Sequence, residues 1–326
     1  MAEMVKKATR ESFGETVTAL AAEYPEIVVL DADLAAATKT GIFKKAYPER
    51  FFDCGIAECN MVGVAAGLAT CGKIPFAASF AMFSAGRAFE QVRNSVGYPK
   101  LNVKIVGSHA GISVGEDGAT HQCCEDIALM RTIPGMVILN PCDHYEMQAA
   151  VRAAVEHKGP CYIRLGRLAV ESINNNDDYK FELGKGITLR EGTDITVVAT
   201  GLMVQEAVKA ADALKEEGIS VEVINIHTIK PLDEELVIAS AKKTGRVITV
   251  EEHNIIGGLG EAVSTALSEH CPTPVTRIGV NDVYGHSGPA VDLLKEFGLS
   301  AEHIAEVIRE KARKVSFSAG FRFKTA

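Results

Sequence analysis

Three short segments of the sequence concentrate side chains that could do chemistry. The densest, residues 107–122, contains four glycines, the histidines His109 and His121, and the acids Glu116 and Asp117. A loop that only connects two elements has little use for so many titratable groups, whereas hydroxyl recognition and proton transfer need them. We therefore predict that this segment binds a polar substrate and moves protons.

A second segment carries a single glutamate, Glu58, at the start of an almost wholly apolar stretch, residues 59–71. A carboxylate in the first turn of a helix is also favoured by the helix dipole, and on pattern alone that structural explanation is the more frequent one. The stretch nevertheless has the composition of a helix buried on all sides, where desolvation favours the neutral form of a carboxyl group. Glu58 could then share a proton with a ligand nitrogen.

The third segment contains Phe80 and Phe83, three residues apart after a predicted strand. By spacing alone, ordinary core packing explains such a pair well. The two rings could instead form an apolar face on which a flat heterocycle stacks.

The elements that must position these side chains alternate along the first half of the chain. Continuous apolar strands between helices are typical of a parallel sheet covered on both faces. The three segments then follow strand ends, where open α/β sheets bind ligands. The predicted strands are residues 27–30, 74–79, 103–106, 136–139 and 162–165, and the predicted helices are 59–71, 84–96, 125–131 and 143–156.

A polar, turn-prone stretch within residues 171–185 separates this series from a second one. The second series has predicted strands at 195–199, 221–226, 247–251 and 275–278, and predicted helices at 204–215, 234–242, 261–268 and 301–314. The sequence thus predicts an α/β protein with two parallel-sheet domains, residues 1–180 and 190–326, each within the usual size range of a domain.

The composition is that of a soluble globular protein, with 47% hydrophobic and 23% charged residues in a chain of 326. The net charge of −8 disfavours a nucleic-acid-binding protein, which needs a basic face. No apolar run approaches the roughly 18 residues that span a membrane, and the first residues lack a signal-peptide pattern. We expect a cytoplasmic protein that contacts neither nucleic acid nor membrane.

Eight cysteines form no C-x-x-C pair. His121 lies close in sequence to Cys123 and Cys124, but a zinc site would need four ligands at a recognisable spacing. We predict reduced, mostly buried thiols and no metal ligand in this chain.

At these segments the sequence resembles the C-terminal half of transketolase, and the resemblance covers nearly the whole chain. It rests on FDCGIAE at residues 52–58 and GEDGATHQ at 115–122, and on two stretches of the second domain, 225–233 and 251–260. The resemblance implies a pyrimidine-binding domain followed by the transketolase C-terminal domain, whose role is mainly structural. It also implies thiamine diphosphate as the cofactor.

Carried over residue by residue, the resemblance assigns the cofactor contacts first. Glu58 would hydrogen-bond the ring nitrogen of the aminopyrimidine and so activate the cofactor, which supplies the hard chemistry. Phe83 would stack on that ring, with Phe80 beside it. Gly86 stands where a third aromatic is often found in the family.

The resemblance assigns the substrate contacts to the remaining candidates. His109, Asp117 and His121 would face the sugar hydroxyls and the transferred protons. Arg10 and Arg167 would hold the sugar phosphate, because a guanidinium suits a phosphate geometrically. The implied reaction transfers a two-carbon ketol unit from a ketose phosphate to an aldose acceptor.

One departure from the family pattern concerns the substrate. Many transketolases place a phosphate-binding serine in Gly-Gly-Ser-Ala-Asp-Leu, where this chain has LDADL at residues 30–34. Asp31 would repel a phosphate. We therefore expect either that the acceptor is placed differently in the site or that it is an unusual sugar phosphate, such as a branched one, rather than the ordinary pentose-phosphate pair.

The family holds the cofactor's diphosphate and its Mg²⁺ through a Gly-Asp-Gly stretch that this sequence lacks. The resemblance therefore implies a split transketolase in which an N-terminal subunit provides the diphosphate and magnesium site. Two copies of each chain about a twofold axis would form an α2β2 complex, and this chain alone would be inactive. The final segment, residues 315–326, carries three phenylalanines and could dock on a partner.

Four alternatives remain open from the sequence. The beta subunit of a 2-oxo acid dehydrogenase and a deoxyxylulose-phosphate synthase share this fold, although the GEDGATHQ loop favours transketolase over the dehydrogenase. A regulatory binding module on the same fold would have no need of Glu58 and the loop histidines. A Rossmann nucleotide binder is weaker still, because GLG at residues 258–260 lacks the third glycine and the downstream acid.

Overall fold

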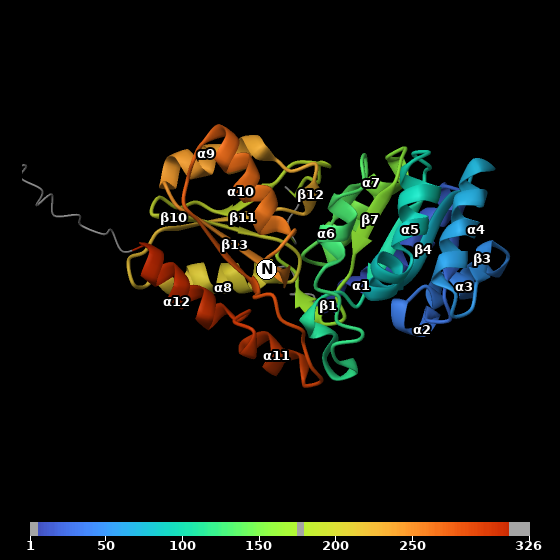
Figure 1. The fold of residues 1–326 in the computed structure, drawn as a ribbon, viewed down its shortest axis with the longest axis horizontal. Coiled ribbons are helices and arrows are strands. Elements are labelled where there is room, and N and C mark those ends of the chain that lie inside the picture. The colour runs from blue at the N-terminus through green and yellow to red at the C-terminus, as the bar shows by residue number, and fades with distance from the viewer. Residues whose placement is uncertain (1–5, 175–178, 313–326) are drawn as a thin grey trace, which may run out of the picture.

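The computed structural model describes residues 6–174 and 179–312. Two α/β domains lie side by side in Figure 1, the first drawn from blue to green and the second from yellow to red. The predicted two-domain α/β architecture is confirmed. The last two residues of the predicted helix 301–314 and the segment 315–326 lie outside the described residues.

Seven strands form the sheet of the first domain, in the order β12-β6-β7-β5-β4-β2-β3. All but β12 run parallel; β12 comes from the second half of the chain and pairs antiparallel with β6. The strands are β2 (Ile27–Asp31), β3 (Phe51–Asp53), β4 (Ile74–Phe80), β5 (Lys104–Ser108), β6 (Val137–Leu139), β7 (Cys161–Arg164) and β12 (Thr228–Lys230). The second domain therefore contributes a strand to the first domain's sheet, which no local pattern predicted.

Helices cover both faces of this sheet (Figure 1). The α-helices are α1 (Thr9–Glu23), α2 (Ala35–Thr38), α3 (Gly41–Ala46), α4 (Glu58–Thr70), α5 (Phe89–Gln91), α6 (Asp126–Arg131) and α7 (His144–Glu156). Two 3-10 helices, η1 (Pro48–Arg50) and η4 (Ile112–Asp117), and two π-helices, η2 (Met82–Arg87) and η3 (Val92–Gly97), complete the set. The single helix predicted at 84–96 is thus two wide π turns around α5, and π turns are frequent at functional sites.

Helix α4 begins at Glu58, as predicted, but it is not buried on all sides. Val62 and Ala65 pack into the core, whereas Gly63 and Gly67 on the opposite side are exposed. The apolar composition of this helix comes partly from small residues, which hide the polar periodicity that an exposed face normally shows.

The second sheet has five strands in the order β14-β13-β10-β11-β9, all parallel except the edge strand β9. Its strands are β9 (Ile187–Arg190), β10 (Ile195–Ala199), β11 (Val221–Asn225), β13 (Val247–Asn254) and β14 (Val275–Val280). Its helices are α8 (Met203–Lys215), α9 (Glu234–Thr244), α10 (Leu259–His270), α11 (Ala290–Glu296) and α12 (Ala301–Ala312). A separate antiparallel pair, β1 (Lys6–Ala8) and β8 (Ala169–Glu171), lies beside the junction of the domains.

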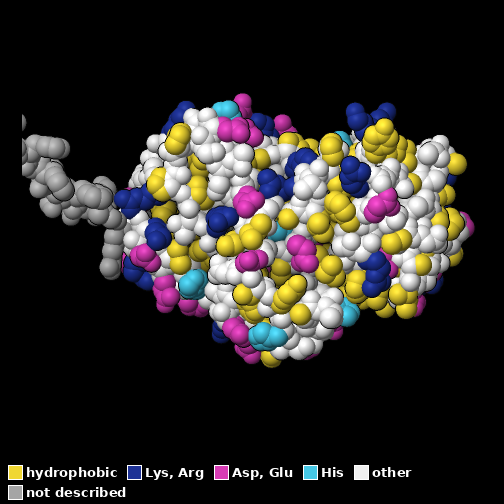
Figure 2. All heavy atoms as spheres, viewed as in Figure 1, with side chains coloured by type: hydrophobic (Ala, Val, Ile, Leu, Met, Phe, Trp, Pro, Cys, Tyr) yellow, Lys and Arg dark blue, Asp and Glu magenta, His cyan; other side chains and the backbone are white. Residues whose placement is uncertain are grey.

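The distribution of charged side chains on the surface and the state of the cysteines are consistent with what the amino-acid composition predicts. On the face drawn in Figure 2, lysine and arginine side chains lie among acidic and hydrophobic ones. None of the described helices is both long and apolar enough to cross a membrane. The eight cysteines are free; Cys71 is exposed and the others are wholly or partly buried.

A buried ion pair joins the two domains. Arg164, at the end of β7, donates from Nε to Asp126 Oδ2 over 2.8 Å, and Tyr162 donates its hydroxyl to the same oxygen. Arg164 Nη2 also donates to the carbonyl oxygen of Glu252 in β13 over 2.9 Å. Burial opposes ionisation of Asp126, but Arg164 holds the pKa of this carboxyl below its ordinary value. The network fixes β7, α6 and β13 to one another.

Replacing Asp126 with alanine should lower the free energy of unfolding by about 3–5 kcal/mol, because it leaves the Arg164 charge buried without its carboxylate. Urea denaturation at neutral pH measures this loss. Glu23→Ala is a matched control, since it breaks the exposed pair between Glu23 and Arg152 and should change stability little. A loss for Asp126→Ala no larger than that of the control would contradict the prediction.

Candidate active site

The candidate side chains gather at one edge of the first sheet. Glu58 follows β3, Phe80 ends β4 and Phe83 follows it, His109 follows β5, and Arg167 follows β7. These four strands are parallel, so their carboxyl ends meet at the same edge, the usual place for a ligand in an open α/β sheet.

Four aromatic side chains form a continuous wall at this edge. The rings of Phe80 and Phe83 are nearly parallel, with an interplanar angle of 7° and centroids 6.0 Å apart. His109 stacks on Phe80 with a centroid distance of 3.9 Å, and His121 meets Phe83 edge-on at 5.3 Å. The fold thus brings together residues that are predicted separately from two segments of the sequence. We refer to these four residues as the aromatic wall.

Both ring nitrogens of His109 are engaged. Nε2 lies 3.3 Å from Arg10 Nη1, which can only donate, so Nδ1 carries the proton and donates to Ser108 Oγ at 2.8 Å. Burial, together with the charges of Arg10 and Arg167, lowers the pKa of His109 to about 3. His109 is therefore neutral at physiological pH, held in a left-handed backbone conformation with φ 54°.

His121 and Asp117 have different surroundings. His121 is half-buried and its Nδ1 lies 2.9 Å from Thr120 Oγ1. Asp117 is exposed at the end of η4 and makes no hydrogen bond or ion pair with another described residue. The structure places Asp117 at the rim of the loop and not in contact with the two histidines. Among residues 6–174 and 179–312, no three His, Cys, Asp or Glu side chains are grouped closely enough to hold a metal ion.

The two candidate arginines lie beside His109. Arg10, in the first turn of α1, donates from Nη1 to the Ala37 carbonyl over 2.8 Å, and its buried Nε has no partner among the described residues. Arg167 pairs with the exposed Glu116 at 2.7 Å. Burial and the nearby charge of Arg167 lower the pKa of Arg10, against the opposing effect of Glu11. This corner of the site therefore carries closely spaced positive charge with an unused donor.

Asp31 does not face this corner. It is fully buried at the end of β2, where its carboxylate accepts hydrogen bonds from Leu34 N at 2.6 Å, Thr38 Oγ1 at 2.7 Å and Thr40 Oγ1 at 2.8 Å. Burial raises the pKa of Asp31 although these bonds oppose the shift. The expectation that Asp31 repels a substrate phosphate is wrong, because its acceptors are used within the turn that follows β2. The burial of Asp31 removes the sequence-based reason for an unusual acceptor, and the identity of the acceptor stays a prediction.

Met82 fills the space next to Gly86. A Cβ atom at position 86 would collide with the terminal methyl group of Met82, so no further side chain fits there while Met82 keeps this conformation. The position at which the family often has a third aromatic is thus occupied by a flexible apolar side chain.

Glu58 has a partner that the sequence did not reveal. Its carboxylate is only 2% exposed, and Arg87 Nη1 lies 2.8 Å from Glu58 Oε2. The same guanidinium covers Phe83, with its central carbon 4.6 Å from the ring centroid. The sequence did contain one signal for the contact between Arg87 and Phe83. Arg87 follows Phe83 by four residues in a predicted helix, so the two side chains lie one turn apart on the same face.

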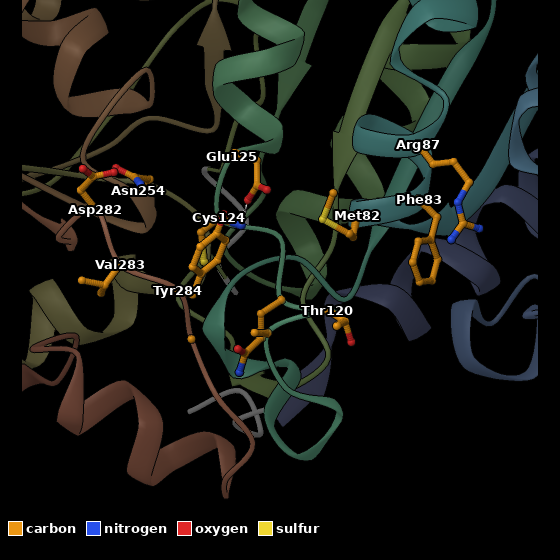
Figure 3. Close-up of a pocket in the computed structure, with 13 residues that line it drawn as sticks. Met82, Phe83, Arg87, Thr120, Cys124, Glu125, Asn254, Asp282, Val283 and Tyr284 are labelled. Atoms are coloured by element: carbon orange, nitrogen blue, oxygen red, sulfur yellow. Dashed lines mark hydrogen bonds between the residues drawn. The ribbon is translucent and has the colours of Figure 1, made fainter.

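A groove of about 680 Å³ extends from the aromatic wall to the second domain. Figure 3 shows Met82, Phe83 and Arg87 on one side of this groove and Glu125, Asn254, Asp282, Val283 and Tyr284 on the other. The second domain also holds the glycine-rich loop in place, because Gln122 Nε2 donates to the carbonyl oxygens of Ile112 and His286.

The arrangement suits the pyrimidine half of thiamine diphosphate. A flat group, the guanidinium of Arg87, already bridges the buried carboxylate of Glu58 and the face of Phe83. An aminopyrimidine is also flat, and its ring nitrogen would accept a hydrogen bond from the carboxyl group while the ring stacks on an aromatic face. Glu58, Phe80 and Phe83 are the residues of this chain that would hold it.

Comparison with known proteins identifies the domain that contains this site as a pyrimidine-binding domain. The chain matches the model of the transketolase pyrimidine-binding domain over residues 5–172 and that of the transketolase C-terminal domain over residues 184–304. It is 52% identical over 312 residues to a putative transketolase C-terminal section from Methanocaldococcus jannaschii, covering 95% of this chain and 98% of that protein. It is 40% identical to human transketolase, covering 93% of this chain but only 49% of that protein.

Solved structures of transketolases also resemble this chain. The chain superimposes with a TM-score of 0.87 on a structure described as a split gene transketolase, inactive beta4 tetramer, at 51% identity, covering 94% of this chain and 98% of that one. The transketolase of Campylobacter jejuni gives a TM-score of 0.81 at 26% identity, with 94% of this chain and 47% of that one covered. These matches favour transketolase over the dehydrogenase, synthase and regulatory alternatives. The chain belongs to the transketolase family, as a C-terminal section that carries the pyrimidine-binding and C-terminal domains.

Proposed function

We propose that this chain, together with an N-terminal subunit that carries the diphosphate and Mg²⁺ site, transfers a two-carbon ketol unit from a ketose phosphate to an aldose acceptor. The observation that carries the proposal is the meeting of residues from the ends of different strands beside one groove. Phe83 and Arg87 line the groove, and His121 meets the Phe83 ring edge-on. Glu58 pairs with Arg87. The similar chain described as inactive in a beta4 tetramer supports the need for a partner. An α2β2 assembly with twofold symmetry is the arrangement we propose.

When bound, thiamine diphosphate supplies the carbanion chemistry that breaks the bond next to the ketose carbonyl. Glu58 contributes a carboxyl group that would donate a proton to the aminopyrimidine ring nitrogen and, as a carboxylate, would then accept the hydrogen bond from the N–H so formed. Its burial strengthens that hydrogen bond, because water does not compete for it. Phe83 supports the plane of the ring, and Phe80 with His109 backs Phe83 through stacked contacts.

The two histidines take different parts in this proposal. His109 is neutral and uses both nitrogens, so it holds Arg10 and shapes the wall that faces the sugar. His121 has one nitrogen on Thr120 and no hydrogen bond to Nε2 among the described residues, so Nε2 is the atom that exchanges a proton with a sugar hydroxyl. Asp117, at the rim, would accept a hydrogen bond from a hydroxyl of the acceptor.

Arg10 and Arg167 would bind the anionic end of the sugar. The unpartnered Nε of Arg10 is a free donor, and Arg167 can exchange its exposed partner Glu116 for a phosphate. Two relatives, 46% and 41% identical, are named for 6-deoxy-6-sulfo-D-fructose and apulose 4-phosphate, both sugars with an anionic group. A sugar with a charged terminus is therefore the substrate class that we propose.

Mixing this chain with its N-terminal partner, thiamine diphosphate and Mg²⁺ should produce ketol transfer that neither chain catalyses alone. Sugars with and without a phosphate should be compared as donors and acceptors, and the phosphorylated ones should have the lower KM, since hydrogen bonds to charged groups contribute about 1.5–3 kcal/mol. A mixture that decarboxylates a 2-oxo acid but transfers no ketol unit would overturn the proposal.

Glu58→Gln in the reconstituted pair should slow ketol transfer by about 100-fold or more, because the amide cannot share a proton with the ring nitrogen. Deuterium exchange at the thiazolium carbon of the bound cofactor measures the activation step directly and should slow in parallel. Glu90→Gln, which alters an exposed carboxylate, is the matched control. Near-normal exchange in Glu58→Gln would remove this residue from the proposed role.

His121→Ala should lower kcat by about 100-fold while the affinity for thiamine diphosphate changes less than about twofold, because the imidazole acts on the sugar and not on the cofactor. Steady-state kinetics and calorimetric titration of the cofactor separate the two effects. His270→Ala, at an exposed histidine of the second domain, is the control. Loss of cofactor binding in His121→Ala would assign His121 to the cofactor contacts instead.

A further inference from the structure

Arg87 occupies the position between the two groups that this chain offers to an aminopyrimidine. Phe83 and Arg87 both belong to the π-helix η2, and Arg87 is its last residue. The guanidinium carbon lies 4.6 Å from the Phe83 ring centroid, within the range of a cation–π contact. Its Nη1 lies 2.8 Å from Glu58 Oε2. One planar cation thus takes up both the ring face and the carboxylate.

The two ends of this ion pair differ in exposure. The Glu58 side chain is 2% exposed and the Arg87 side chain 49% exposed. A buried carboxylate is strongly destabilising without a partner, whereas a half-exposed arginine can move into water at small cost. No other ion pair of Glu58 exists among the described residues. Arg87 is therefore the group that stabilises Glu58 in the free chain, and it is also the group that can leave.

We propose that Arg87 is the resident counter-ion of Glu58 in the cofactor-free protein and that the aminopyrimidine must displace it to bind. This inference rests on the function proposed above. Both contacts of the guanidinium are lost together when it swings out, because they belong to one rigid group. Arg87 then acts as a positioning residue that keeps the Glu58 side chain aimed at the site before the cofactor arrives and sets the affinity with which the cofactor enters.

Removal of Arg87 should change the stability of the cofactor-free protein and its affinity for thiamine diphosphate in opposite directions. If the guanidinium fills the site in about 90% of cofactor-free molecules, the Kd of the cofactor is about tenfold higher than for an open site. Removing Arg87 should then tighten cofactor binding while it destabilises the free protein. A residue that only supported the fold would, on removal, lower stability and weaken or leave unchanged the affinity.

The test uses Arg87→Ala and Arg87→Lys in the reconstituted pair, with Arg93→Ala as control. Arg93 is an exposed arginine in η3 whose side chain donates to Asn94 and not to Glu58. Calorimetric titration gives the Kd of thiamine diphosphate at fixed Mg²⁺, and thermal unfolding without cofactor gives the melting temperature. We expect Arg87→Ala to lower Kd by about 5- to 10-fold and to lower the melting temperature of this chain. For Arg87→Lys, the Kd and the melting temperature should lie between those of the wild type and Arg87→Ala. An ammonium group pairs with a carboxylate but does not stack on an aromatic ring as a planar guanidinium does.

A second comparison ties the effect to Glu58. In a Glu58→Gln background the neutral amide needs no counter-ion, so adding Arg87→Ala should change Kd by less than about twofold. A Kd for Arg87→Ala equal to or higher than that of the wild type, in a pair that still assembles, would overturn the inference. A wild-type pair that binds no thiamine diphosphate would instead refute the proposed function, so the two failures are distinguishable.

Discussion

The geometry of the site depends on the buried hydrogen bonds that the Arg164 guanidinium group makes. It is buried at the end of β7, pairs with Asp126 at the start of α6, and donates to the backbone of Glu252 in the second domain. The Glu252 side chain in turn accepts a hydrogen bond from Ser113 N over 2.6 Å, in the glycine-rich loop. A chain of charge-assisted bonds therefore runs from the sheet of one domain through the other domain to the loop that carries His109 and His121.

Because this network crosses the domain boundary, the second domain is part of the site's support. The loop is packed so closely that small residues are required: a Cβ at Gly111 would strike the Glu252 carboxylate, and one at Gly118 would lie 2.5 Å from Ser287 Oγ. Positive φ angles at Gly111 and Gly118 impose the same requirement. Gly111 and Gly118 thus serve close packing against the second domain, while His109 and His121, on either side of them in the sequence, form part of the aromatic wall.

Much of the fold could be predicted from the sequence because the signals are local. Predicted strands such as 27–30, 74–79 and 195–199 lie within one residue of β2, β4 and β10, since continuous β-branched runs leave few other solutions. Helix α1 gave no such signal. Its buried face includes Ser12 and Thr16, whose hydroxyls donate to the backbone carbonyls four residues earlier, and these polar residues blur the apolar period.

The sequence by itself determined the α/β class, the start of α4 at Glu58 and the segments in which site chemistry would be found, because residue type and spacing encode them locally. Only the tertiary structure decided which side chains meet. The strand order places the ends of β3, β4 and β5 along one edge, with β2 between β3 and β4, so that Arg87 reaches Glu58 and His109 stacks on Phe80. The tertiary structure also decided that Asp31 points into the protein interior and that β12 joins the first sheet. Such contacts join residues far apart in the chain, and no periodicity along the sequence records them.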